Sequence, residues 1–157
     1  MLFIQEANGE YRAADEDDVI SEATQIYGSY FAKGTLISEP ADSADYLKLK
    51  LAQYDHEVFI CLFLDTRHRV ISCDEMSHGT IDQANVYPRE IIKATLRHNA
   101  SAVIFAHNHP SGLAEPSDAD KRITAKLKNA LETIDVKVLD HIIIGDGTYS
   151  FAEKGIL

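Results

Sequence analysis

Residues 106–120 read AHNHPSGLAEPSDAD, and they carry more chemical information than any other part of the chain. His107 and His109 stand two residues apart, and in extended backbone such residues point to the same side. Prolines and a glycine then interrupt regular structure, and Ser117 opens a helical pattern in which Asp120 lies one turn along. Two imidazoles and one carboxylate can therefore meet and leave a fourth position open. That is the catalytic form of a zinc site, with three protein ligands and a water.

The same residues carry a resemblance to a known family. Their spacing matches the signature H-x-H-x7-S-x2-D of the JAMM (MPN-domain) metalloproteases. The sequence HNHPSG resembles the RadC branch of that family. Two flanking blocks agree with it, YPRE at residues 87–90 and DHIIIG at residues 140–145. The resemblance extends from about residue 40 to the C-terminus. It implies a three-layer α/β/α architecture around a mixed sheet, the MPN fold, which is similar to that of the cytidine deaminases.

The resemblance also implies a reaction and a set of site residues. It implies that His107, His109 and Asp120 hold Zn²⁺ and that a metal-activated water cleaves a peptide or isopeptide bond. Two imidazoles and a carboxylate suit zinc, with another divalent ion as the alternative. Ser117 has two roles open to it. As an N-cap it would satisfy a backbone N–H of its helix, and as the JAMM serine it would donate a hydrogen bond to the oxyanion of a tetrahedral intermediate.

A metal-bound water also needs a general base. Our candidate is Glu57, which stands at the start of an apolar run, where a charged residue is unusual unless it faces a cleft. It also lies upstream of the histidines, as the JAMM glutamate does. Glu75 is the rival candidate, and Glu90 is a weaker one because it stands on a helix beside Arg89. His141 is expected either near the metal, orienting a ligand, or simply satisfied in the core.

Apolar runs and their breaks predict an α/β fold. The expected strands are residues 2–4, 57–64, 70–78, 102–106, 136–144 and 148–151. The expected helices are residues 19–31, 44–54 and 88–98 and the segment that starts at Ser117. Strands pair directly in the first half and alternate with helices in the second, which predicts a mixed sheet with helices on both sides. We divide the chain into an N-terminal helical extension, residues 1–40, and a RadC-like MPN/JAMM domain, residues 41–157. The helix-hairpin-helix region of longer RadC-like proteins is expected to be missing.

The composition limits location and partners. The 157 residues carry 15 basic against 25 acidic side chains, a net charge of −10, without the basic cluster that is typical of nucleic-acid binding. We see no apolar run long enough for a membrane span and no secretory segment at the start. We therefore expect a cytoplasmic protein in which Cys61 and Cys73 are free thiols. The expected partner is a peptide or protein substrate, and association with a second copy of the chain is left open.

Two other functions stay open. One is a non-catalytic MPN scaffold that binds a protein partner, although every position of the signature is intact. The other is a DNA-processing metalloenzyme, since RadC-like proteins are named for DNA repair. A deaminase of similar fold would carry H-x-E and P-C-x-x-C, which this chain lacks, and nucleases usually use carboxylate-rich magnesium sites.

Overall fold

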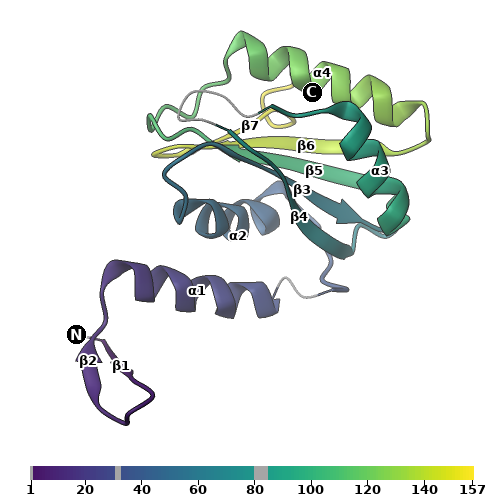
Figure 1. Ribbon diagram of the computed structural model, residues 1–157. Helices are drawn as coiled ribbons and strands as arrows, with labels where there is room; N and C mark the ends of the chain where they lie inside the picture. Colours follow the sequence, from purple (N-terminus) through teal and green to yellow (C-terminus); the bar gives the residue numbers. More distant parts are fainter. Residues whose placement is uncertain (1, 31–32, 80–84) are drawn as a thin grey trace.

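A five-stranded mixed sheet forms the centre of the computed structural model, which describes residues 2–30, 33–79 and 85–157. The strands are β3 (Val58–Leu64), β4 (Val70–His78), β5 (Ala102–Asn108), β6 (Lys137–Ile144) and β7 (Thr148–Ser150), in the order β4-β3-β5-β6-β7. β5 and β6 pair in parallel, and the other neighbours pair antiparallel. One face is covered by α2 (Pro40–Ala52) and the other by α3 (Pro88–His98) and α4 (Asp118–Glu132) (Figure 1). The predicted α/β/α fold is therefore confirmed.

β3 is buried on both faces, and this explains its uninterrupted apolar sequence. Alternate side chains point to opposite sides of the sheet. Ile60 and Leu62 pack in the core beneath α2, whereas Phe59 and Phe63 pack in the core beneath α3 and α4. The side chains of β5 alternate in the same way. Ile104 lies on the α2 side, whereas its neighbours Val103 and Phe105 lie on the side of α3 and α4.

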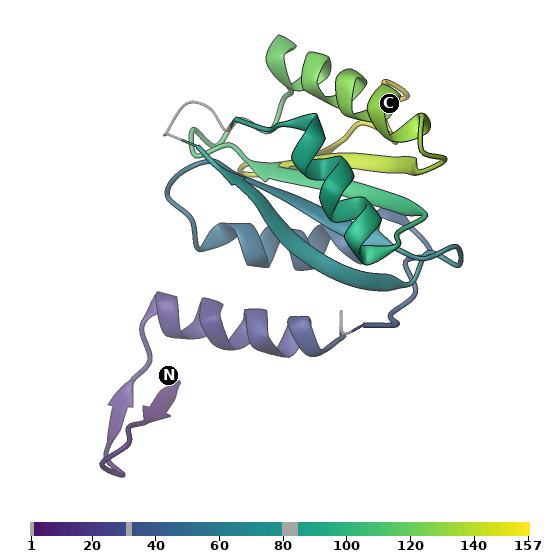
Figure 2. The ribbon, with the colours of Figure 1, turned by 45° about the vertical axis from the view of Figure 1, so that its right-hand side comes forward.

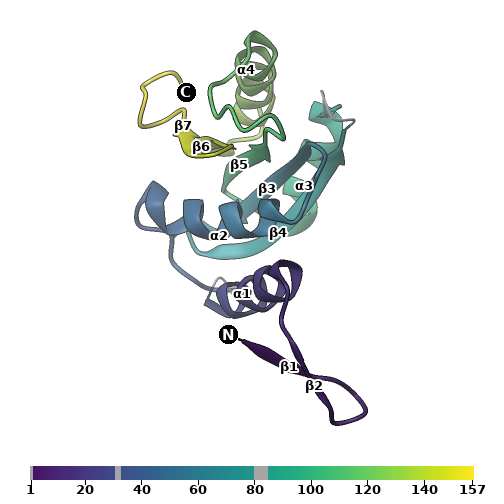
Figure 3. The ribbon, with the colours of Figure 1, turned by 90° about the vertical axis from the view of Figure 1, so that its left-hand side faces the viewer.

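The N-terminal segment lies outside these three layers. It consists of a hairpin, β1 (Phe3–Gln5) paired with β2 (Tyr11–Ala13), followed by α1 (Glu16–Tyr30). α1 packs against α2 on the side away from the sheet, and the hairpin extends away from the body of the molecule (Figures 2 and 3). The sequence predicted one short strand here and missed its partner, β2. The predicted helix end at Phe31 lies outside the described residues, and the domain boundary after residue 40 stays a prediction.

Several elements differ by a few residues from the predicted ends, and two of these differences have a clear physical cause. α2 begins at Pro40 rather than at residue 44, because proline fits the first turn of a helix and Asp42 accepts hydrogen bonds from the backbone N–H groups of Ser38 and Glu39. β5 continues through Asn108 instead of ending at residue 106, since it has a hydrogen-bonded strand on each side. Over the described ranges, we find no helix with both the length and the apolar character that a bilayer crossing requires.

The two cysteines are free, as the sequence predicts, and the sheet keeps them apart. Cys61 belongs to the core beneath α3 and α4, whereas Cys73 packs against the core beneath α2. Burial raises the pKa of the Cys61 thiol and raises that of Cys73 to about 11. Both thiols are therefore protonated and poorly nucleophilic in the folded protein at neutral pH.

We expect iodoacetamide to alkylate neither cysteine readily in the native protein at pH 8. Unfolding in urea without a reducing agent should expose both thiols, because no disulfide has to be broken. Mass spectrometry of the alkylated protein counts the modified sites. Fast labelling of the native chain, or an unlabelled pair after unfolding, would contradict the placement of the two residues.

Candidate metal centre

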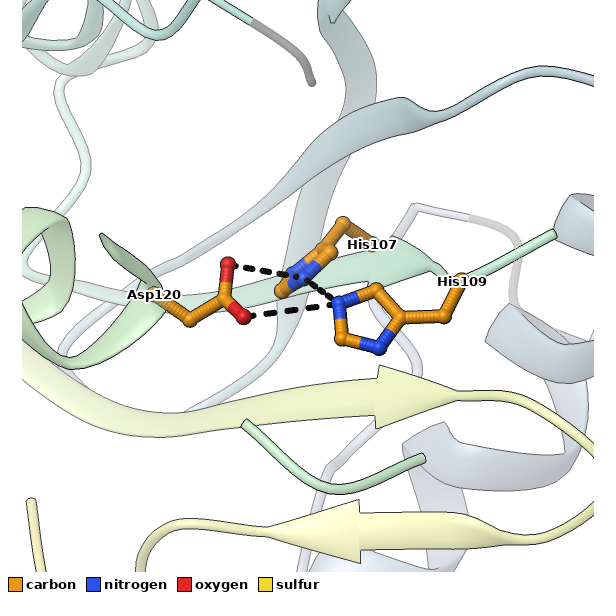
Figure 4. Close-up of side chains that lie close together, drawn as sticks. All are labelled: His107, His109 and Asp120. Atoms are coloured by element: carbon orange, nitrogen blue, oxygen red, sulfur yellow. Dashed lines mark hydrogen bonds and ion pairs between the residues drawn. The ribbon is translucent and has the colours of Figure 1, made fainter. Parts of the chain in front are cut away.

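The two histidines and the aspartate of the sequence motif meet at one edge of the sheet. His107 is in β5, His109 follows that strand, and Asp120 lies in the first turn of α4. The Nε2 atom of His107 lies 2.9 Å from Nε2 of His109 and 3.2 Å from Oδ1 of Asp120. The Nε2 atom of His109 lies 3.4 Å from Oδ2 of Asp120 (Figure 4). One nitrogen or oxygen from each residue thus falls within 4.8 Å of the others, and the group could hold a metal ion.

The hydrogen bonds around the histidines point their Nε2 atoms at one another. His109 Nδ1 lies 2.7 Å from the carbonyl oxygen of Leu113, so it carries the hydrogen and leaves a lone pair on Nε2. His107 uses its own Nδ1 in a 2.8 Å contact with Nε2 of His141. Two Nε2 lone pairs would repel each other at 2.9 Å, so either a hydrogen or a metal cation must lie between these atoms. Two imidazoles and one carboxylate are a donor set that fits a metal ion at this position.

Asp120 is held by its own helix terminus. Its Oδ2 accepts hydrogen bonds from the backbone N–H of Ser117, at 2.7 Å, and from the Ser117 hydroxyl, at 2.6 Å. The Ser117 oxygen in turn accepts from the backbone N–H of Asp120. Ser117 is therefore the N-cap of α4, in a reciprocal capping box. This is one of the two roles that the sequence leaves open.

The electrostatics of the group favour a negative carboxylate beside the imidazoles. Burial on its own would raise the pKa of Asp120, but the facing imidazoles of His107 and His109 and the Ser117 hydroxyl together hold that pKa well below its usual range. The hydrogen bond to Asp120 raises the pKa of His109, against the opposing effect of burial. Burial lowers the pKa of His141 well below its usual value, so that this ring is neutral.

A cavity of about 430 Å³ opens over the three residues. Glu57 and Ser117 line it together with His107, His109 and Asp120. Other parts of its wall are apolar and include Phe59, Val86 and Ile123. Glu57 therefore lines the same cavity as the three candidate ligands, and its role as a general base stays a prediction.

The two rival carboxylates do not reach this cavity. Glu75 pairs in register with Ile60, whose side chain faces α2, so Glu75 lies on the opposite side of the sheet from His107. There it accepts a 2.7 Å hydrogen bond from the Tyr54 hydroxyl. Glu90 is exposed on α3, where it pairs with a lysine of the same helix. Of the three candidate bases, the structure brings only Glu57 to the site.

The sequence prediction overlooked the residue between the two histidines. Asn108 is buried and points away from them, toward the α2 side. Its Oδ1 accepts a 2.8 Å hydrogen bond from the backbone N–H of Val58, and its Nδ2 donates one of 2.8 Å to the carbonyl of His56. Asn108 therefore holds the backbone on both sides of Glu57.

A glycine in the β6–β7 turn supports the loop that follows the histidines. A Cβ atom on Gly145 would lie 2.2 Å from the carbonyl oxygen of Gly112. The same carbonyl accepts a 2.7 Å hydrogen bond from the backbone N–H of Asp146. This contact requires glycine at position 145 and fixes the loop between His109 and α4. The sequence alone does not show that this turn glycine supports the loop after the histidines.

Comparisons with known proteins settle the family. The profile of the RadC-like JAB domain matches residues 37–156. The chain belongs to the RadC-like JAB family. A UPF0758 protein of Vibrio cholerae is 50% identical to this RadC-like chain over 144 residues, which cover 92% of the chain and 91% of that protein.

Two further relatives show that the family also has longer members. A UPF0758 protein of Nitrosococcus oceani is 57% identical over 126 residues, which are 80% of this chain and 56% of that protein. One of Thioalkalivibrio sulfidiphilus is 46% identical over 149 residues, 95% of this chain and 67% of that protein. The RadC-like chain therefore spans most of the Vibrio relative but little more than half of the Nitrosococcus relative. The family predicted from the motif is confirmed.

We expect Asn108→Ala to destabilise the fold by about 1–3 kcal/mol, because it leaves the buried N–H of Val58 without an acceptor. Urea unfolding measures the change. Asn129→Ala, at an exposed position of α4, is the matched control and should shift stability by no more than about 0.5 kcal/mol. Equal effects of the two substitutions would contradict the role given to Asn108.

Proposed function

We propose that the chain is a zinc-dependent hydrolase that cleaves a peptide or isopeptide bond. One observation carries the proposal. The three residues that could hold a metal lie in a cavity that also contains a carboxylate, Glu57, placed apart from the group of three. Such a set of three protein ligands with a separate carboxylate suits a hydrolytic site better than a structural zinc site, which usually has four protein ligands.

Each side chain of the site has a defined task in this proposal. His107, His109 and Asp120 would hold Zn²⁺, and the bound ion would supply Lewis-acid chemistry. Glu57 takes the proton from the attacking water and passes it to the leaving amine.

Ser117 has a second task in addition to the N-cap. Its hydroxyl lines the cavity, and at present its hydrogen goes to Asp120 Oδ2. We propose that the hydroxyl rotates to donate to the oxyanion when substrate is bound, while the backbone N–H of Ser117 continues to hold Asp120.

The substrate is proposed to be a peptide or protein in the cytoplasm. A DNA substrate is disfavoured because the net charge is −10 and phosphate backbones are bound by basic surfaces. The family's association with DNA repair is therefore not part of the proposal. The alternative is a non-catalytic scaffold. Zinc content and peptide cleavage together distinguish it from an enzyme.

We expect the purified protein to contain one zinc ion per chain and the His107→Ala variant to contain almost none after gel filtration. Elemental mass spectrometry measures the metal content, and anomalous scattering from crystals identifies the bound metal. His68→Asn is the control, since His68 is exposed at a turn with φ of 57°, a conformation that asparagine tolerates. Wild-type protein that takes up no zinc at micromolar concentration would rule the proposal out.

We expect Glu57→Gln to keep the fold and the zinc and to lower the rate of peptide cleavage by about 100-fold or more, the usual scale for a general base. The assay follows a proteome-derived peptide library by mass spectrometry. Glu75→Gln, on the far side of the sheet, should change the rate little. Zinc binding without cleavage by the wild type would favour the scaffold, and full activity of Glu57→Gln would move the base elsewhere.

A further inference from the structure

Thr124 of α4 belongs to a chain of three hydrogen bonds that ends at His107 of the candidate metal centre. Its hydroxyl oxygen lies 2.6 Å from the carbonyl oxygen of Asp120, one turn earlier in the helix, and 2.6 Å from Nδ1 of His141. The other nitrogen of that ring, Nε2, lies 2.8 Å from Nδ1 of His107. All three side chains are at least 97% buried, so water offers them no other partner.

The direction of every hydrogen bond follows from the first one. A carbonyl oxygen can only accept, so the hydroxyl hydrogen of Thr124 must lie between the two oxygens, which otherwise would repel each other at 2.6 Å. The hydroxyl has no second hydrogen, and it therefore accepts from the Nδ1–H of His141. The Nε2 of His141 then carries a lone pair and accepts from the Nδ1–H of His107.

The surroundings of His141 favour the neutral ring that this order requires. The ring stacks on Phe151, with centroids 4.9 Å apart, and meets the edges or faces of Phe59 and Phe105 at 5.4 and 5.9 Å. Such an apolar cage disfavours a charged imidazolium. A neutral ring has one donor and one acceptor nitrogen, and Thr124 decides which nitrogen is which.

We propose that Thr124 is a positioning residue that selects the tautomer of His107 through His141. It directs the hydrogen of His107 to Nδ1 and leaves the Nε2 lone pair pointing at His109 and Asp120, where a metal ion would bind. The inference rests on the proposed metal centre and adds to it a residue that touches neither the metal position nor the substrate cavity.

Thr124→Val tests the inference, because valine has nearly the shape of threonine and lacks the hydroxyl. With zinc bound, His107 must still donate from Nδ1, so His141 must keep its hydrogen on Nδ1, now without an acceptor. We expect the zinc affinity to fall by about 10-fold to 100-fold. In the metal-free variant, His141 should move its hydrogen to Nε2. Thr124→Ser restores the hydroxyl and should behave as the wild type.

Two measurements give the answer. Competition between the protein and a fluorescent chelator for zinc chloride gives the affinity, and long-range ¹H–¹⁵N spectra of the histidine rings give the tautomers. The inference predicts Nδ1–H for His141 in the metal-free wild type and in Thr124→Ser. Thermal unfolding followed by circular dichroism checks that each variant is folded.

The outcomes separate this inference from the proposed function. If the wild type binds no zinc, the metal centre fails, while the His141 spectrum still tests the hydrogen-bond order. If wild type and Thr124→Val bind zinc equally well, the inference is wrong and the metal centre stands. An Nε2–H tautomer of His141 in the wild type overturns the inference even if Thr124→Val does not fold.

Discussion

The parallel pairing of β5 with β6 is the constraint on which the candidate metal centre depends. Parallel neighbours cannot be joined by a tight turn, so the chain crosses one face of the sheet as α4. The end of β5 and the start of α4 therefore lie at the same edge, and this brings His107 beside Asp120. The same pairing puts His141 opposite Phe105. Phe105 stands two residues before His107, so the side chains of all three residues lie on the same face of the sheet.

The alternation of side chains at the end of β5 joins the candidate ligands to the candidate base. His107 faces the α4 side and contributes to the metal centre. Asn108 faces the α2 side and bonds to the backbone of Val58 and His56, the neighbours of Glu57. Consecutive residues of one strand thus set the position of an imidazole and of the carboxylate that would act beside it. In this chain, the middle residue of H-x-H therefore has a structural role.

The sequence allowed the fold class, most elements and the main site residues to be predicted, because these depend on local patterns. β4 and α3 have the predicted ends, at Val70–His78 and Pro88–His98. Contacts between elements that no motif marks could not be predicted. Thr124 looks like one more polar residue in an amphipathic helix, and its partner His141 is 17 residues away. Glu75 competed with Glu57 because a sequence does not show which face of a sheet a strand residue occupies.

The arrangement of layers also separates the N-terminal segment from the proposed chemistry. α1 packs on the outer side of α2, and α2 covers the face of the sheet opposite to α4. No described residue before Glu57 lines the cavity. The exposed apolar side chains of this segment, among them Phe3, Tyr11 and Ile26, therefore cannot serve the metal centre directly. Within a single chain, the surfaces of this segment therefore lie on the α2 side of the sheet, away from the cavity.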